Sequence, residues 1–350
     1  MLIGFQNYVI CFFMSLAVSG FLVLLFQNHN MPKLQSFSGP QKIHEGFVPR
    51  FGGFAVLSGL FPTLLFFPSV NPSLFMILTL VALPVLLVGL LEDFTGCVSA
   101  RIRFSVSLLA GGLFCLISDY VISSVDIALI DFFLSVPVVA ILLTILAVAS
   151  LSNSLNMIDG LNGLAGSSTV FMTMSLGFLA SQSGDDQLSV ICYTLAASSL
   201  GFLLLNFPFG KLFLGDGGAY FLGFFIATIA IIMPERNFDI SPFSSLLIVM
   251  YPFYELCRSF VRRILTAGGH VFRADDKHLH SLVFRYMKTR SDLSPRIQHT
   301  VSSLIMMSLP LICCSWAVFF SGDLFSLVVG VFVFVIVYEM LAYQVRHAIS

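Results

Sequence analysis

The heptapeptide L-F-L-G-D-G-G at Leu212–Gly218 stands between two apolar runs, at about 188–205 and 218–233. Runs of this length approach the roughly 20 apolar residues that a helix needs to cross a bilayer. The heptapeptide therefore lies at a membrane boundary, where it places the carboxylate of Asp216 between glycines. A charge in that position is costly unless it binds something. We expect Asp216 to bind a metal ion, although a plain turn would also explain these residues.

The composition is that of a membrane protein. Of the 350 residues, 57% are hydrophobic and 10% are charged, whereas a soluble domain has about 25% charged residues. We therefore predict an all-α, polytopic integral membrane protein that forms a single domain over 1–350. It would have about 11 transmembrane helices, at 8–26, 51–68, 73–91, 104–118, 133–151, 163–181, 188–205, 218–233, 243–261, 300–320 and 324–343.

Two further features of the sequence concern its first helix and its cysteines. The run Tyr8–Phe26 has no basic region before it and no small-residue cleavage site, so we expect a retained helix and no signal peptide. The seven cysteines form no Cys-x-x-Cys pair, and most lie within apolar runs. This pattern predicts small buried hydrophobic side chains.

The basic residues predict the orientation of the chain. All but Arg236 of the 17 Lys and Arg residues fall on one side of the predicted membrane. The positive-inside rule makes that side the cytoplasm, with the N-terminus outside and the C-terminus cytoplasmic. The outside connections look short and are acidic, with Asp119, Asp126, Asp131, Asp185, Asp186, Glu235, Asp239 and Asp323. The inside connections are longer, and we expect the chemistry there, at about 27–50, 92–103, 152–162, 206–217 and 262–299.

The first two inside connections carry an arginine and a pair of acids. The segment P-R-F-G-G at 49–53 combines Arg50 with glycines that permit close backbone approach; a snorkelling arginine at a helix entrance is the alternative. Glu92 and Asp93 end a predicted helix, where carboxylates oppose the helix dipole. Coordination of Mg²⁺ or uptake of a proton would justify that cost. The alternative is a solvated helix end that pairs with a nearby arginine such as Arg103.

The next two inside connections offer groups that suit a nucleotide. In N-S-L-N-M-I-D-G-L-N-G, a helix would place Asn153, Asn156 and Asp159 on or near one face. Amides beside an acid suit a nucleobase or a sugar, although a structural polar patch is the alternative. In the heptapeptide, the glycine amides could approach phosphate and Phe213 could stack on a base.

The longest inside connection, 262–299, mixes cations, imidazoles and acids. It holds His270, Arg273, Asp275, Asp276, Lys277, His278 and His280. No cysteine or further ligand pair completes a zinc set around the His-x-His element. The segment fits a diphosphate better, and a basic loop on anionic lipid is the alternative. Together, the inside connections suggest a nucleotide-linked substrate that meets a lipid substrate.

The order of these motifs resembles the polyprenyl-phosphate N-acetylhexosamine-1-phosphate transferase superfamily, of the glycosyltransferase family 4 type. The motifs that carry the resemblance run from about 41 to 284: P-R-F-G-G, Glu92-Asp93, N-S-L-N-M-I-D-G-L-N-G-L-A, N-F-P-F-G-K-L-F-L-G-D-G-G and R-A-D-D-K-H-L-H. P-R-x-G-G and His-x-His resemble the branch that initiates O-antigen and enterobacterial common antigen synthesis more than the peptidoglycan translocase, which has a histidine triplet.

The resemblance implies a reaction, a cofactor and a location. Undecaprenyl phosphate would attack the β-phosphate of a UDP-N-acetylhexosamine, giving undecaprenyl-diphospho-sugar and UMP. Mg²⁺ would be required, and Mn²⁺ could substitute for it. The enzyme would be a multi-pass protein of the bacterial inner membrane with a cytoplasmic active site, in contact with membrane lipid and not with nucleic acid. Related enzymes can form homodimers.

The resemblance also implies roles for individual residues. Asp216 and Asp93 match metal ligands, and the candidate catalytic residues are Asp93, Glu92, Asp216, His278 and His280. The candidate substrate-binding residues are Asn156, Asp159, Asn162, Asn206, Phe213, Arg103, Arg50, Arg273 and Asp275. Among them, Asn206 and Phe213 match uracil-contacting positions, and the two histidines match the element beside the diphosphate. The chain departs from the pattern at Glu92 and Asn162, where the family usually has Asp.

Two other functions fit the same composition. A transporter or flippase for an anionic lipid-linked sugar would place ionisable residues in mid-membrane and show repeat symmetry. Here the acids are predicted at the inside ends of helices, and the sequence shows no repeat. A non-catalytic relative would be consistent with Glu92 and Asn162, whereas Asp93, Asp159 and Asp216 are all retained.

Overall fold

The structure is a computed structural model, and it describes residues 2–28, 48–66, 72–266 and 277–349. Within these ranges every regular element is an α-helix. The helices are α1 (Leu2–Asn28), α2 (Gly52–Phe66), α3 (Pro72–Thr95), α4 (Ala100–Ser118), α5 (Ala128–Leu134), α6 (Pro137–Ile158), α7 (Leu164–Gln182), α8 (Asp186–Asn206), α9 (Gly215–Arg236), α10 (Pro242–Ile248), α11 (Met250–Thr266), α12 (Leu279–Arg290), α13 (Pro295–Phe319) and α14 (Leu324–Ile349).

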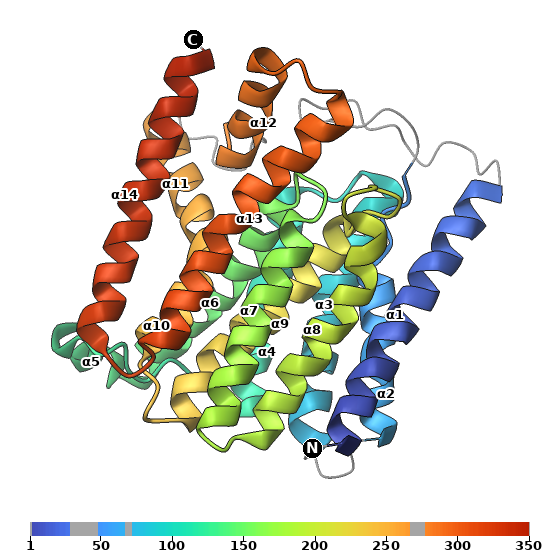
Figure 1. Ribbon diagram of the computed structural model, residues 1–350. Coiled ribbons are helices and arrows are strands. Elements are labelled where there is room, and N and C mark those ends of the chain that lie inside the picture. Colours follow the sequence, from blue (N-terminus) through green and yellow to red (C-terminus); the bar gives the residue numbers. More distant parts are fainter. Residues whose placement is uncertain (1, 29–47, 67–71, 267–276, 350) are drawn as a thin grey trace.

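The helices form the bundle of a polytopic membrane protein (Figure 1). Nine helices of the described ranges are long and apolar enough to cross a membrane: α1, α3, α4, α6, α7, α8, α9, α13 and α14. Two further predicted crossings correspond to the shorter helix α2 and to the pair α10 and α11. The all-helical, multi-pass prediction is confirmed, and the count of about 11 crossings stays a prediction.

Several predicted boundaries differ from the observed ones. The predicted crossing at 133–151 is interrupted, because α5 ends at Leu134 and α6 begins at Pro137, a residue that suits the first turn of a helix. The outside connection before α6 is therefore not a plain turn, since it contains α5. The inside segment 262–299 likewise contains α12, whose Leu279, Leu282 and Val283 are buried on one side. The spacing of these three residues is that of an amphipathic helix.

Helix α9 forms the centre of the bundle. It packs against α3 and α6, and also against α2, α7 and α10. Its membrane-crossing window is 94% buried inside the protein, compared with 28% for α1 and 22% for α14. The heptapeptide ends in the first turn of this helix, so Asp216 is built onto the most enclosed element of the fold.

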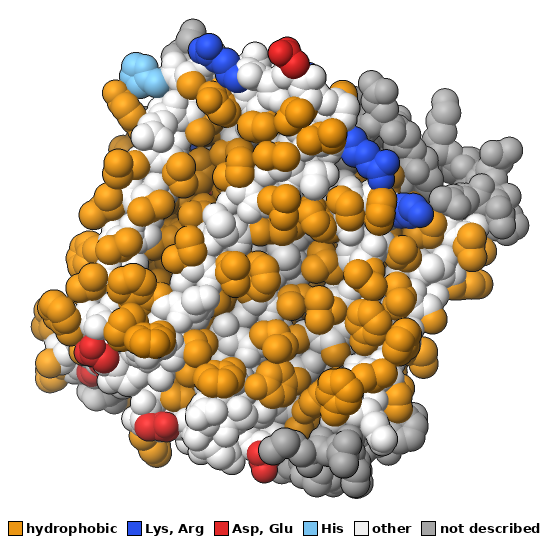
Figure 2. Space-filling model, in the orientation of Figure 1, with side chains coloured by type: hydrophobic (Ala, Val, Ile, Leu, Met, Phe, Trp, Pro, Cys, Tyr) orange, Lys and Arg blue, Asp and Glu red, His pale blue; other side chains and the backbone are white. Residues whose placement is uncertain are grey.

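The two ends of the bundle differ in charge. The chain termini lie at opposite ends (Figure 1). On the face shown in Figure 2, apolar side chains cover the middle, Lys and Arg lie toward the end that carries the C-terminus, and most Asp and Glu lie toward the other end. This distribution is the one expected of a membrane protein whose basic end faces the cytoplasm.

The cysteines follow the prediction except at one position. All seven are free, and Cys11, Cys115, Cys192, Cys313 and Cys314 are buried while Cys257 is partly buried. Cys97 is exposed, because it lies in the short connection between α3 and α4 and not inside an apolar helix. The expectation of a buried side chain is therefore wrong for Cys97.

Candidate active site

The backbone before α9 is fixed by the segment Pro49–Gly53. The N–H of Phe213 donates to the carbonyl of Pro49 at 2.9 Å, and Gly52 and Gly53 donate back to the carbonyls of Phe213 and Leu214 at 2.9 and 3.1 Å. Gly215 then adopts a φ of +77°, which favours glycine, and the helix begins. The motif P-R-F-G-G thus forms one wall of the turn that carries Asp216.

Glycines allow three backbones to meet at the first turn of α9. A Cβ atom on Gly53 would lie 2.3 Å from the Cα atom of Gly218, and one on Gly89 would lie 2.5 Å from the Cα atom of Gly217. Neither position has room for any side chain, since real Cβ atoms essentially never come within 3.0 Å of such neighbours. Helices α2 and α3 therefore touch the start of α9 through backbone atoms.

Asp93, from the last turns of α3, caps the N-terminus of α9. Its Oδ1 accepts the backbone N–H of Asp216 at 3.0 Å, and its Oδ2 accepts that of Gly217 at 2.9 Å. The side chain is buried, with 7% exposed. Free N–H groups and the dipole at a helix N-terminus favour a carboxylate there. Both oxygens of Asp93 therefore hold the backbone of Asp216 in place.

The side chain of Asp216 forms an ion pair with Arg103 of α4. The Arg103 guanidinium also lies over the ring of Tyr220, 5.6 Å from its centroid. The Tyr220 hydroxyl donates to the Oδ1 of Asn153 at 2.9 Å, which connects this cluster to α6. Asp216 and Arg103 remain 18% and 14% exposed, so a ligand can reach both charged groups.

Glu92 points away from this contact. Its Oε2 accepts the backbone N–H of Val98 at 2.7 Å, which closes the connection between α3 and α4. The two adjacent acids therefore make different contacts: Asp93 caps α9, and Glu92 orders the connection that leads to Arg103.

Asn206 joins the two connections that precede α7 and α9. Its Oδ1 accepts the N–H of Gly163 at 2.6 Å, and its Nδ2 donates to the carbonyl of Leu212 at 2.8 Å. Asn162 is buried and packs beside Gly210, where a Cβ atom would lie 2.6 Å from its Nδ2. Both ends of the Asn206 amide thus bind backbone, and Phe213, which follows Leu212, is partly exposed.

Asp159 is the C-cap of α6, and the charges of Arg50 and Asp93 act on its carboxyl group. Desolvation raises the pKa of the Asp159 carboxyl to about 8; Arg50 opposes this shift and Asp93 adds to it. A cation beside this carboxyl would lower its pKa again. Asn156, one turn earlier, is partly exposed.

The His-x-His element packs against the same connection. The rings of His278 and His280 stack with centroids 5.6 Å apart and an interplanar angle of 1°. A Cβ atom on Gly160 would lie 2.2 Å from Nε2 of His280, so this ring rests on the residue that follows Asp159. Burial, with His278 adding to it, lowers the pKa of His280 to about 4, and its imidazole is neutral at pH 7. Of the other predicted residues in this segment, Arg273 and Asp275 lie outside the described residues.

The carboxylates of the site can be compared with the ligands that Mg²⁺ prefers. Within the described ranges, no group of three or more His, Cys, Asp and Glu side chains could hold a metal by itself. Mg²⁺ is usually bound by one or two carboxylates together with waters and substrate phosphates. Asp216 fits that pattern as a partly exposed oxygen ligand, whereas both oxygens of Asp93 already accept backbone hydrogen bonds. The residues fit an ion held by Asp216 and completed by water and diphosphate.

Two residues of the site were missed by the sequence interpretation. Tyr220 links Arg103 to Asn153, and its place one turn after Asp216 was a signal that could have found it. Glu255 is fully buried in α11 and hydrogen-bonds to Nδ1 of His278 at 2.9 Å. A single acid inside the predicted apolar crossing at 243–261 was the available signal.

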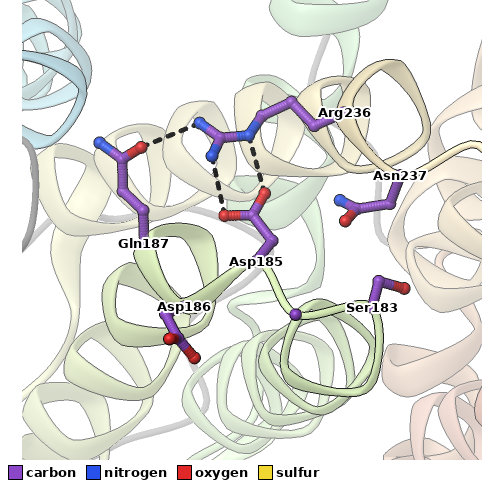
Figure 3. A pocket seen from close by; sticks show the side chains of 7 residues that line it. Ser183, Asp185, Asp186, Gln187, Arg236 and Asn237 are labelled. Carbon is purple, nitrogen blue, oxygen red and sulfur yellow. Dashed lines mark hydrogen bonds and ion pairs between the residues drawn. The ribbon is translucent and has the colours of Figure 1, made fainter.

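An open pocket of about 410 Å³ lies at the opposite, acidic end of the bundle. Figure 3 shows Arg236 between Asp185 and Gln187 in this pocket. Arg236 binds Asp185 at 2.7 and 2.8 Å and Gln187 at 3.0 Å. These charges neutralise each other and join α8 to α9, so the pocket has a structural explanation.

The fold and the site together define a polytopic helical membrane protein with a charged site at one end. A family model described as "Glycosyl transferase family 4" matches residues 75–234, which include Asp93, Asp159 and Asp216. Arg50 and the His-x-His element lie outside this match.

Individual relatives point to the same class. A probable undecaprenyl-phosphate N-acetylglucosaminyl 1-phosphate transferase of Bacillus subtilis (strain 168) is 27% identical over 250 residues, 69% of this chain and 66% of the relative. Undecaprenyl-phosphate alpha-N-acetylglucosaminyl 1-phosphate transferases of Yersinia pestis and Thermotoga maritima are 28% and 29% identical, over 70% of this chain and 68% and 71% of theirs. The chain thus spans about two thirds of the length of these relatives. The matches support the superfamily of polyprenyl-phosphate sugar-1-phosphate transferases.

Proposed function

We propose that the chain transfers a sugar 1-phosphate from a UDP-N-acetylhexosamine to undecaprenyl phosphate and releases UMP. The reaction would be the first membrane step of O-antigen or another cell-envelope polysaccharide, with the site facing the cytoplasm of a bacterial inner membrane. The observation that carries the proposal is the cap of Asp93 on α9, which presents Asp216 beside Arg103 at the basic end of the bundle. The similarity to undecaprenyl-phosphate N-acetylglucosaminyl 1-phosphate transferases supports it.

The chemistry requires electrostatic help more than a base. A phosphate oxygen of the lipid would form a bond to the β-phosphorus of the donor, and the bond from that phosphorus to the bridging oxygen of UMP would break. Since nucleophile and donor are both anions, their repulsion is a main part of the barrier, and positive groups lower it. Mg²⁺, when bound at Asp216, would polarise the diphosphate oxygens.

Three residues of the protein would have different roles in this reaction. Asp93 holds the first turn of α9, whose free N–H groups favour anions nearby. Arg103, which pairs with Asp216, would offset the negative charge of the diphosphate, and Asp216 would hold the Mg²⁺ ion. Asn206 fixes the connection that carries Phe213, the residue proposed to stack on uracil.

The decisive experiment measures UMP release by the purified protein with undecaprenyl phosphate, Mg²⁺ and a panel of UDP-N-acetylhexosamines. We expect release with at least one donor and none after chelation of the metal. Asp216→Asn should abolish release while the protein still inserts into membranes. Asp131→Asn is a matched control, because Asp131 accepts the N–H of Val125 at the opposite end of the bundle. Absence of UMP with every donor would refute the proposed function.

A further inference from the structure

Glu255 is a completely buried acid held by groups from two other helices. The Tyr338 hydroxyl of α14 donates to its Oε2, and its Oε1 lies 2.9 Å from Nδ1 of His278. The backbone N–H of Leu279, the first residue of α12, lies 3.4 Å from both oxygens. A buried carboxylate is costly unless it is paired and hydrogen-bonded. The three contacts meet this requirement, and two of them come from His278 and Leu279, the first two residues of the His-x-His element.

The contact with Glu255 determines which nitrogen of His278 carries a proton. A carboxylate can only accept, so Nδ1 must be the donor. In the neutral ring Nε2 is then the nitrogen without a proton, and the direction in which it points follows from the orientation of the ring. Since the His278 side chain is 4% exposed and stacks on His280, the ring has little freedom to turn.

The histidine pair connects Glu255 to the candidate active site. His280 rests on Gly160, next to Asp159. Its Nδ1 is buried and has no hydrogen-bond partner within the part of the chain that the structure describes. A continuous set of contacts therefore runs from α14 through Glu255 and the two rings to the end of α6.

We propose that Glu255 is a positioning residue that holds the ring of His278, through its Nδ1–H, in the orientation in which the His-x-His element meets the diphosphate of the donor. This inference rests on the proposed function. Glu255 itself touches no substrate and acts through His278.

The test is a double-mutant cycle on the binding of UDP with Mg²⁺ and on UMP release. Glu255→Gln keeps the size of the side chain and removes its charge. We expect it to weaken UDP binding and to lower kcat/KM for the UDP-sugar by about 10- to 100-fold, the range for loss of a charged hydrogen bond. In a His278→Gln background, the same change should have less than about a twofold further effect, since the residue through which Glu255 acts is gone. UDP binding keeps the cycle measurable when the His278 variant releases no UMP.

Two further variants separate positioning from folding. Tyr338→Phe removes one donor from Glu255 without touching His278, and we expect a smaller loss of UDP affinity that also disappears in the His278→Gln background. Glu339→Gln is the control: this acid of α14 pairs with Arg258 and Tyr254, and its loss should leave UDP binding unchanged.

Each outcome has a defined meaning. Equal losses from Glu255→Gln in both backgrounds would show that Glu255 only supports the fold, and wild-type affinity in Glu255→Gln would overturn its role directly. If the wild-type protein neither binds UDP nor releases UMP, the proposed function fails and the inference fails with it. Wild-type activity with an inert Glu255→Gln change would refute the positioning role alone.

Discussion

The carboxylate of Asp93 and the backbone of Asp216 form a two-point contact, in which two N–H groups at the start of α9 meet two oxygens from the end of α3. Two neighbouring acids such as Asp93 and Asp216 suggest that both bind one metal ion. In this protein Asp93 instead binds the backbone of the first turn of α9, whereas the side chain of Asp216 is partly exposed and can face a ligand. Substitutions of Asp93 and of Asp216 should therefore have different effects.

Asp93→Asn should lower UMP release by at least about 10-fold, because a charged cap is replaced by an amide whose NH₂ group would oppose a backbone N–H. The expected signature is a fall in kcat together with a lower apparent unfolding temperature, since a helix cap contributes about 0.5–2 kcal/mol. Steady-state kinetics and thermal unfolding in detergent measure the two effects. A variant with full stability and no activity would instead place Asp93 in direct contact with the substrates.

Gly53→Ala should prevent α2 from reaching α9, since the added Cβ atom would lie 2.3 Å from the Cα atom of Gly218. We expect a strong loss of folded protein and of UMP release, assessed by size-exclusion profile and activity. Gly20→Ala is the matched control, because a Cβ atom there would meet nothing within 4 Å. If both variants behave like the wild type, the close approach of α2 and α9 is wrong.

His280→Asn should change how the stability of the folded protein depends on pH. Burial lowers the pKa of His280 from 6.5 to about 4. As the pH falls through this window, the unfolded chain takes up a proton that the folded chain excludes, so the folded state loses stability. The variant lacks this loss, and its apparent unfolding temperature relative to the wild type should rise between pH 6.5 and 4. A constant difference across that window would contradict the shift.

Asp159→Asn should change the pH dependence of stability in the opposite direction. The raised pKa of Asp159, about 8 against an ordinary 3.8, means that the folded chain keeps a proton that the unfolded chain releases. The resulting stability is complete below about pH 3.8 and is lost as the pH rises through 8. The wild type should therefore lose its advantage over the variant between pH 5 and 9. Thermal unfolding at intervals of one pH unit, each compared with His280→Asn, separates the two groups.

Cys97 provides a test of orientation. It is the one cysteine of the chain that is exposed, and it follows α3 at the basic end. In intact cells, a membrane-impermeant maleimide should label Cys97 only after the cells are permeabilised. In a Cys97→Ser background, Phe238→Cys should be labelled without permeabilisation, since Phe238 is 93% exposed at the other end. Reversed labelling would invert the predicted topology.

The sequence was sufficient to predict the helical, multi-pass fold, since uninterrupted apolar runs have few alternatives in a membrane. It was less informative where two physical preferences compete. Residues 133–151 are apolar throughout, yet Pro137 begins a new helix and leaves α5 outside it. The segment 279–290 is polar enough to resemble a loop, yet it folds as α12 because three apolar side chains become buried together.

The candidate site could be predicted as a set of residue types but not as a set of contacts. The motifs at 49–53, 92–93, 153–163 and 206–218 do meet at one end of the bundle. Which groups bind side chains and which bind backbone depends on how helices pack, and this has no periodic signal. Asn206 is the example: its position suggested uracil, whereas both ends of its amide hold backbone in the structure. Glu255 is the opposite case: no motif includes it, yet it binds His278, which is 23 residues away along the chain.

The enclosure of α9 has a consequence for how the protein responds to its bilayer. Membranes differ in thickness, and helices that contact lipid adjust to the difference by tilting. In this fold such adjustment falls on α1, α4 and α14, which are mostly exposed, whereas α9 is surrounded by protein along nearly all its length. The helix that bears Asp216 therefore has little contact with lipid, and we expect the geometry of the site to respond less to bilayer thickness than the tilt of the outer helices does.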